Sequence, residues 1–416
     1  MAFTYRDNEL YIEDVKVDEI AKKINTPTYC YSLKTIRDNF NSFYQSLPGF
    51  LICFAVKSNS NLSILKIIGQ LGGGADVVSE GEIRLALAAG IPPEKIVFSG
   101  VGKTASEIRY ALTVKVHQLN FESIEELKQI NTIASDMGTC AMVVARLSPD
   151  IDAKTNYKIS TGLYKNKFGI PMEILEKIDF KTLPNVKLCG VSAHIGSQIC
   201  SLEIFLKLVN YMKDARVKLN SLGHNIRRID LGGGLGVSYA HNKEAPPIAE
   251  YAKLLRDNLS GLDCEFICEP GRSIIANTAV LLSQVLYRKS NDFVSHVIID
   301  AGMNDFVRPA VYGSLHQIIP AKKDPSLPIE TVDIVGPVCE TSDTFAKDYS
   351  IQRLKNGDLV CVCDVGAYGG SMCNTYNSRL LPAEVLINGN RISVIRNRGN
   401  YEDLLKQTII CDGIDQ

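Results

Sequence analysis

Lys57 ends a short apolar run, Leu51 to Lys57, and a polar turn of serine and asparagine residues follows it. A lysine at the mouth of a buried strand is partly desolvated, which lowers the pKa of its amine and leaves a fraction of it uncharged. An uncharged amine is the nucleophile that carbonyl chemistry requires. For one lysine taken alone, a solvated strand end is the more common explanation, so the neighbouring motifs must decide.

Other residues of reactive type also stand where short apolar runs end. One such residue is more often structural, but their repetition at successive strand ends favours one shared site. Asp76, Glu82 and Arg146 are the weakest members, since they could equally cap a helix, lie on a helix face or end a solvated strand. The set is Lys57, Asp76, Glu82, Arg146, His194, Ser197, Gly232, Gly233, Gly234, Glu269, Gly271 and Arg272.

The elements that would position these residues form a repeating pattern between residues 51 and 272, in which short apolar runs alternate with longer amphipathic stretches. Eight strand-helix units in so short a stretch predict a (β/α)8 barrel better than an open doubly wound sheet. In such a barrel the active groups gather at the C-terminal ends of the strands. The expected strands are 51–57, 74–79, 95–100, 118–122, 140–147, 187–197, 228–234 and 265–272. The clearest helices are 62–71, 80–89, 104–112, 123–137 and 203–222.

After Arg272 the pattern changes to strand-like runs separated by turn signals, and Asn388-Gly389 is a strong hairpin signal between the last two. The first 25 residues also look like strands. We therefore expect a barrel domain at 26–273 and a mostly antiparallel β domain built from 1–25 and 274–416. The later strands are expected at 280–287, 296–299, 331–335, 358–364, 384–387 and 391–394.

Composition indicates a globular chain that acts on small molecules. The 416 residues are 45% hydrophobic and carry a formal net charge of -1, which gives no electrostatic reason to expect nucleic acid or an anionic membrane as a partner. The N-terminal residues lack the pattern of a secretory signal, and no apolar run is long enough to span a bilayer. A cytoplasmic location is therefore expected.

The chain has twelve cysteines, and no paired Cys-x-x-Cys spacing suggests a metal site. Most of those in apolar runs are expected to be buried, reduced thiols. Cys339 differs because it lies in a polar loop, residues 336–343, where exposure and reactivity are plausible. The thiols expected to be buried are Cys53, Cys140, Cys189, Cys264, Cys268, Cys361 and Cys363.

The glycines that follow Asp230 leave backbone N–H groups free to approach an anion. Ser197 and Gly271 could complete a phosphate cradle. A nicotinamide cofactor is the alternative, but the glycine run is no true Gly-x-Gly-x-x-Gly, and it falls at the seventh strand, where barrels often bind phosphate. A phosphorylated cofactor bound by a barrel is therefore favoured.

This constellation resembles the fold-type III pyridoxal-phosphate enzymes, and within them it is most similar to the diaminopimelate decarboxylases. The resemblance spans nearly the whole chain. Its departures are small, with Glu80 where a small residue is common and Ser58 where alanine is common, and neither residue has an assigned role. The motifs that carry it are Phe54–Asn59, Ala75–Glu82, Phe98–Thr104, His194–Gln198, Glu269–Arg272, Asp300–Asp305, Arg308–Tyr312, Cys339-Glu340 and Gly366–Tyr368.

The resemblance implies that Lys57 binds pyridoxal 5'-phosphate covalently, that His194 stacks on its ring and that Glu269 pairs with the pyridine nitrogen. It also implies contributions to the cofactor site from Asp76, Glu82, Arg146 and the glycines 232–234. The phosphate would be held by Ser197, Gly234, Gly271 and Arg272, with Tyr368 closing the site.

Glu269 carries a physical argument about the reaction. A carboxylate beside the ring nitrogen keeps that nitrogen protonated, so that the ring accepts the electrons released when a bond to Cα breaks. Racemases of this group instead place an arginine there. Glu269 therefore favours decarboxylation.

Charge suggests the substrate. Arg272, Arg308 and Tyr312, with Tyr368, would suit a carboxylate at the far end of the substrate, and Glu340 would suit an ammonium. Any one of these arginines alone could be a surface residue. Together they describe a second amino-acid head group, as in meso-2,6-diaminopimelate, whose decarboxylation at the D centre yields L-lysine and completes lysine biosynthesis.

Cys339 and Glu340 belong to the predicted β domain, far from the barrel in sequence. In the family these residues come from the partner subunit, so the resemblance implies a homodimer with shared active sites and Cys339 as the proton donor to Cα. Without the resemblance, a buried structural thiol explains Cys339 equally well.

Three other functions are alternatives to this one. The first alternative is a related ornithine, arginine, lysine or carboxynorspermidine decarboxylase, which should tolerate loss of the arginine cluster. A non-catalytic binding protein should lack Lys57 or Cys339, and both are present. A nicotinamide oxidoreductase is the most distant alternative.

Overall fold

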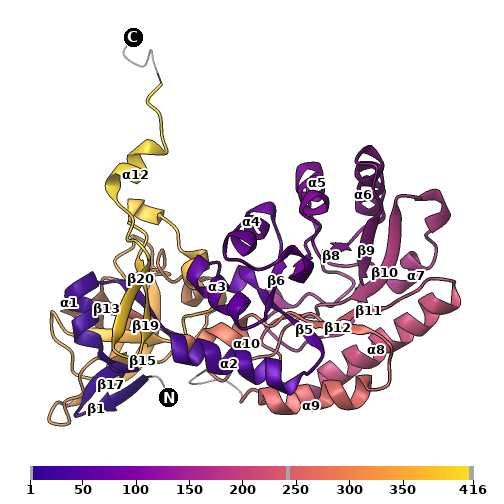
Figure 1. Cartoon of the computed structure of the whole chain (residues 1–416). Coiled ribbons are helices and arrows are strands. Elements are labelled where there is room, and N and C mark those ends of the chain that lie inside the picture. The colour runs from indigo at the N-terminus through magenta and orange to yellow at the C-terminus, as the bar shows by residue number, and fades with distance from the viewer. Residues whose placement is uncertain (1–2, 240–243, 412–416) are drawn as a thin grey trace. The chain divides into compact units, whose positions relative to one another are not determined.

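The computed structural model describes residues 3–239 and 244–411. The chain divides into two compact units (Figure 1). The barrel unit takes in Ile36–Ser238 and the stretch from residue 244 to Ile275. The sheet unit takes in the described chain up to Thr35 and from Ala276 onward, together with Tyr239.

In the described part of the barrel unit, eight strands close into a barrel in the order β10-β11-β12-β5-β6-β7-β8-β9. Every neighbouring pair is parallel, and β12 closes the ring by pairing Phe266 with Phe50 of β5. The predicted (β/α)8 barrel is confirmed. The strands are β5 (Phe50–Ala55), β6 (Gly74–Val77), β7 (Ile96–Phe98), β8 (Gln118–Phe121), β9 (Ala141–Arg146), β10 (Val186–Ser192), β11 (Arg228–Asp230) and β12 (Glu265–Cys268).

Helices flank these strands, and their starts follow from local sequence. Thr104 caps α5 in a capping box with Glu107, and Ser123 caps α6 by accepting from the Glu126 N–H. The longer helices are α2 (Leu33–Ser46), α3 (Leu62–Gln70), α4 (Glu80–Ala88), α5 (Ala105–Val114), α6 (Ile124–Asp136), α8 (Leu202–Ser221) and α9 (Ile248–Leu259). The short helical turns are η1 (Val56–Ser58), η2 (Pro93–Lys95), η3 (Tyr157–Ile159), α7 (Met172–Leu175), η4 (Phe180–Thr182) and α10 (Arg272–Ile275).

The interior of the barrel is apolar in one layer and polar in another. Cys53, Val97 and Ile267 pack together with almost no exposure. Gln118, Asn120 and Asp230 are also buried, although their side chains are polar or charged. Because buried polar groups need partners, this second layer points to a built site.

The main sheet of the sheet unit has the order β17-β16-β14-β13-β4-β19-β20, and β18 joins it between β13 and β15. The pairs β14·β16 and β4·β19 are parallel and the others are antiparallel, which confirms a mostly antiparallel β domain. The strands are β4 (Thr28–Ser32), β13 (Ala279–Ser290), β14 (Ser295–Ile299), β15 (Ile318–Pro320), β16 (Ile329–Val335), β17 (Thr344–Gln352), β18 (Leu359–Cys363), β19 (Ala383–Asn388) and β20 (Arg391–Arg396).

Smaller elements complete this unit. A separate antiparallel meander precedes the main sheet in sequence, and its side chains pack with those of β13 and β19 in one hydrophobic cluster. Its strands are β1 (Phe3–Arg6), β2 (Glu9–Ile12) and β3 (Val15–Lys16). The helices are α1 (Val17–Ile24), η5 (Ala276–Thr278), α11 (Arg308–Tyr312), η6 (Gly370–Met372), η7 (Tyr376–Ser378) and α12 (Tyr401–Lys406).

Several local expectations need correction. The first barrel strand ends at Ala55, so Lys57 lies in the turn η1 and not at a strand end. The sixth strand ends at Ser192, and His194 and Ser197 lie in the loop beyond it. Cys140 is exposed and not buried, because it precedes β9 and does not point into its core. Cys264 and Cys363 are only partly buried.

In the described residues, no helix has the length and apolar character needed to cross a membrane. Nor does that part of the chain contain a group of three or more His, Cys, Asp or Glu residues arranged to hold a metal ion.

Candidate active site

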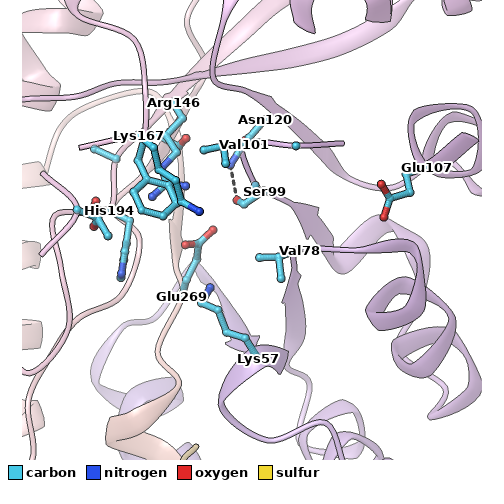
Figure 2. Close-up of a pocket in the computed structure, with 16 residues that line it drawn as sticks. Lys57, Val78, Ser99, Val101, Glu107, Asn120, Arg146, Lys167, His194 and Glu269 are labelled. Carbon is cyan, nitrogen blue, oxygen red and sulfur yellow. Dashed lines mark hydrogen bonds between the residues drawn. The ribbon is translucent and has the colours of Figure 1, made fainter. Parts of the chain in front are cut away.

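A cavity of about 430 Å³ opens among the segments that follow the barrel strands. Lys57, Arg146, His194 and Glu269, all expected from sequence to share a site, line it together (Figure 2). Figure 2 shows the Lys57 amine pointing towards the Glu269 carboxyl group. The cavity therefore combines an amine, an imidazole, a guanidinium and a carboxyl group.

Asp76 determines the direction of the Lys57 side chain. The Lys57 Nζ donates a hydrogen bond to Asp76 Oδ2. The Asp76 side chain is fully buried, whereas that of Lys57 is 35% exposed. An ion pair with a buried carboxylate therefore positions the amine.

Glu82 supports the turn after β6 and is absent from the cavity wall. Its Oε2 accepts a hydrogen bond of 2.8 Å from the backbone N–H of Val78. Burial raises the pKa of Glu82 to about 7, and the neighbouring Asp76 carboxylate adds to this rise. Val78 does line the cavity, so Glu82 acts on its shape through the backbone.

Glu269 presents a buried acceptor to the cavity. It is 8% exposed, and its Oε1 has no hydrogen-bond partner among the described residues. Burial, followed by the nearby Asp230 and Asp76 carboxylates, raises the pKa of Glu269 well above its usual value. A buried polar atom without a partner costs free energy, so Oε1 fits a ligand that brings an N–H donor. A protonated pyridine nitrogen is such a donor.

His194 is held as a neutral ring. Its Nδ1 accepts a hydrogen bond of 3.1 Å from the Gly233 N–H, which leaves the ring proton on Nε2. Desolvation, and then the positive charges of Lys57 and Arg146, lower the pKa of His194 well below its usual value. Gly233 must be glycine, because a Cβ there would lie 2.1 Å from the Glu269 carbonyl oxygen. A neutral ring offers a flat face suited to stacking.

The predicted phosphate residues lie close to one another, outside the lining of the cavity. The Arg272 Nε and Nη2 donate to Ser197 Oγ at 3.2 and 3.1 Å. Gly234 has φ +107°, and a Cβ there would lie 2.4 Å from the Gly196 carbonyl oxygen. The Gly232 N–H is already used, since it donates to Asp230. Arg272, Ser197 and Gly234 therefore come together as an anion site would require, and Gly271 lies beside Arg272 in the chain.

The partners of Arg146 were missed by sequence analysis. The Arg146 Nη1 pairs with Glu122 Oε1 at 2.8 Å, and its guanidinium lies 4.7 Å from the centre of the Phe168 ring. Glu122 is itself fixed, because Glu126 accepts from its backbone N–H and also pairs with the buried amine of Lys103. The sequence did contain a signal for these partners, because Glu122 and Glu126 are charged residues within segments predicted as strand and helix. Charged residues in such segments are usually solvated, so they were not assigned to the site.

The remaining predicted residues belong to the sheet unit and form two groups there. The buried Arg308 guanidinium lies 5.4 Å from the centre of the Tyr312 ring and 5.7 Å from that of Tyr368. Cys339 and Glu340 lie together in an exposed loop, where the Cys339 N–H donates to Asn377. The exposure of Cys339 agrees with the expectation from its polar loop.

A closed β/α barrel with a lysine, a neutral histidine and a buried carboxyl group around one cavity is suited to an enzyme that uses a carbonyl cofactor. A family model for the pyridoxal-dependent decarboxylases, pyridoxal binding domain, matches residues 33–276. The chain is 43% identical to the diaminopimelate decarboxylases of Zymomonas mobilis and of Pseudomonas aeruginosa, with 97% of each chain covered in both cases. The chain belongs to the diaminopimelate decarboxylase family.

Solved structures agree. A diaminopimelate decarboxylase from Helicobacter pylori, complexed with L-lysine, matches with a TM-score of 0.89 and 44% identity over 94% of this chain and 98% of that one. The M. jannaschii diaminopimelate decarboxylase in co-complex with L-lysine matches with a TM-score of 0.92 and 36% identity over 99% and 98%. A lysine/ornithine decarboxylase from Vibrio vulnificus is 20% identical and shows the shared fold alone.

Proposed function

We propose that this protein removes the carboxylate at the D centre of meso-2,6-diaminopimelate and releases CO2 and L-lysine, with pyridoxal 5'-phosphate bound through Lys57. The observation that carries the proposal is that Glu269 Oε1, in the same cavity as Lys57 and His194, has no hydrogen-bond partner in the part of the chain that the structure describes. Family membership supports the substrate.

The barrel residues divide the work of holding the cofactor. Bound pyridoxal phosphate supplies the electron sink that accepts the electrons of the broken Cα–carboxylate bond. The Lys57 amine would hold the cofactor through its carbonyl carbon, with the carbonyl oxygen lost as water, and the Glu269 carboxyl group would accept the N–H of the ring nitrogen. The neutral His194 stacks on the ring. Ser197, Gly234, Gly271 and Arg272 donate to the phosphate.

Substrate selection is assigned to the sheet unit. Arg308, with Tyr312 and Tyr368 beside it, suits the distal carboxylate, because a guanidinium binds a carboxylate through two hydrogen bonds. Glu340 suits the distal ammonium. Ornithine and lysine lack the distal carboxylate, so they leave the buried guanidinium without an anion.

Cys339 and Glu340 are proposed to act in the active site of a second copy of the chain. When CO2 leaves, its bonding electrons stay with the substrate and Cα must gain a proton. The Cys339 thiol supplies that proton and is left as a thiolate, which solvent reprotonates. The exposure of the Cys339 loop supports this role, since an exposed thiol can reach another chain.

The test is an assay of the purified protein with pyridoxal phosphate and each of meso-diaminopimelate, ornithine, arginine and lysine. L-Lysine and CO2 should form from diaminopimelate in equal amounts, with little CO2 from the others. Ornithine as the preferred substrate would contradict the proposal and support a basic amino-acid decarboxylase instead.

A further inference from the structure

A chain of hydrogen-bonded side chains crosses the interior of the barrel. The Asn120 Nδ2 donates to Ser99 Oγ, the Gln118 Nε2 donates to Asn120 Oδ1, and the same Nε2 donates to Asp230 Oδ2, each at 2.8 Å. All four residues are buried. They come from β8, from β11 and from the residue after β7, so this polar chain links three strands.

Asp230 is the last residue of this hydrogen-bonded series, and it forms a carboxyl pair with Glu269. Of the two carboxyl groups, that of Asp230 accepts more hydrogen bonds from other groups. It accepts from Gln118 at Oδ2 and from the Gly232 N–H at Oδ1, at 3.0 Å. Burial raises its pKa to about 6, and these two donors limit the rise. A hydrogen bond between the Asp230 and Glu269 carboxyl groups lowers the pKa of Asp230 and raises that of Glu269. Asp230 accepts from two other donors, whereas Glu269 Oε1 has no hydrogen-bond partner among the described residues, so the proton of the pair is assigned to Glu269.

The hydrogen bond to Asp230 can fix the orientation of the Glu269 carboxyl group. The last torsion of a glutamate side chain has a broad minimum, so a carboxyl group with a single contact can rotate. In Glu269 one oxygen must stay directed at the cavity, where Oε1 has no partner among the described residues. A hydrogen bond from the other oxygen to a fixed anion fixes the plane of the group.

Charge balance favours the same arrangement. Two buried carboxylates at close range cannot both ionise without a large penalty, so the pair holds one proton and one negative charge. One negative charge matches one protonated pyridine nitrogen. No proton needs to move when the ring N–H approaches Oε1.

We propose that Asp230, held by Gln118 and Gly232, is the positioning residue for Glu269: it accepts a hydrogen bond from one carboxyl oxygen and directs Oε1 at the ring nitrogen of the cofactor. The inference goes beyond the proposed function and rests on it for the identity of the ring.

The other ionisable groups near the pair are accounted for. Asp76 raises the pKa of both carboxyl groups, and Lys57 lowers that of Glu269. Burial raises the pKa of the neighbouring thiols and phenol, which stay neutral near pH 7; they are Cys53, Cys268 and Tyr251. None of these three can replace the Asp230 charge.

The experiment is nitrogen NMR of protein reconstituted with pyridoxal phosphate labelled with nitrogen-15 in its ring, recorded over a range of pH. In the wild type the ring nitrogen should stay protonated through neutral pH. In Asp230→Asn the pH at which it loses its proton should fall by about one unit, a roughly tenfold change in the equilibrium. Cofactor affinity, measured by absorbance titration of the cofactor-free protein, should weaken about tenfold or more.

Two further variants keep the test sharp. Gln118→Met removes one donor to Asp230 and should shift the same titration in the same direction by less, which preserves the test if Asp230→Asn does not fold. Glu265→Gln is the matched control, because it also removes one carboxylate. Glu265 begins β12, whereas Glu269 follows the end of that strand, and Glu265 pairs with His117 and Arg228. It should leave the ring titration unchanged.

The outcomes separate the two proposals. A ring titration and cofactor affinity unchanged in Asp230→Asn would overturn the positioning role and leave the proposed function standing. A wild-type protein that binds no pyridoxal phosphate would overturn both.

Discussion

At the scale of single residues, the reactive side chains are held by buried partners. Asp76 orients Lys57, Glu122 orients Arg146, and the Gly233 N–H sets the tautomer of His194. Such partners fix geometry before any ligand binds, which reduces the cost of ordering the site.

Stability of the cofactor-free protein should depend on Asp230 in a defined pH range. Its folded pKa of about 6 lies above the usual aspartate value of 3.8, so the folded state binds the proton more tightly. The resulting stabilisation is complete below about pH 4 and is lost as the pH rises through about 6. Denaturant unfolding should therefore show the free energy of the wild type falling by roughly 1–3 kcal/mol across this range relative to Asp230→Asn. Parallel curves for the two proteins would contradict the assignment.

Arg308 is expected to select the substrate. Replacing it with leucine removes a charged partner of the distal carboxylate and should lower kcat/KM for meso-diaminopimelate by about 10- to 100-fold, mainly through KM. Steady-state assays measure this. Arg391→Leu, a change at an exposed position of β20, is the control and should behave like the wild type. An equal loss in both variants would mean that Arg308 has no special role.

At the scale of elements, the sequence predicted the strands of the barrel well because their apolar runs alternate regularly with amphipathic helices. It predicted neither β4 nor β17. β4 lies between β13 and β19, strands that are more than 240 residues away along the chain, and no local pattern encodes such pairing. β17 is partly exposed and carries polar residues, so its periodicity is weak.

The residues of the candidate site, like the strands, were predicted only in part from the sequence. Lys57, His194 and Glu269 follow apolar runs and were found, whereas Gln118, Asn120 and Asp230 lie within strands and were not assigned a role. Gln118 and Asn120 are two residues apart, which places both amides on one face of β8. Two amides on the same face of a strand could have indicated a buried polar site. Their partner could not be predicted, because Asp230 comes near Gln118 only when the barrel closes.

Lys103 should be important for the stability of the barrel. Its amine is buried and bonds the Gly100 and Asn120 carbonyl oxygens and the Glu126 carboxylate, so it ties the turn after β7 to β8 and α6. Lys103→Met leaves the buried Glu126 carboxylate without its charged partner and should lower the free energy of unfolding by about 3–5 kcal/mol in denaturant titrations. Lys128→Met breaks the exposed pair with Glu125 and should cost less than about 1 kcal/mol. Similar losses in the two variants would refute this role for Lys103.

At the scale of the whole molecule, the chemistry is divided between two units. Apart from Tyr368, the residues assigned to the cofactor lie in the barrel unit. Apart from Arg272, the residues assigned to the distal end of the substrate and to proton donation lie in the sheet unit. Solved relatives match over both units, so these relatives share the fold of each unit.

Mixing two inactive variants tests whether sites are shared between copies. Lys57→Ala and Cys339→Ala should each be inactive alone. If Cys339 acts in the site of its partner, random reassociation into dimers should restore about one quarter of the wild-type activity, since half of the dimers are mixed and each has one intact site. Mixtures that stay inactive after confirmed subunit exchange would show that each site is built from one chain.

The central claim is that Lys57 carries the cofactor, and borohydride reduction tests it most directly. The protein is loaded with pyridoxal phosphate, reduced, digested and analysed by peptide mass spectrometry. We expect a phosphopyridoxyl group on Lys57, in stoichiometric yield, and none in Lys57→Ala. A phosphopyridoxyl group found in comparable yield on another lysine, with Lys57 unmodified, would contradict it.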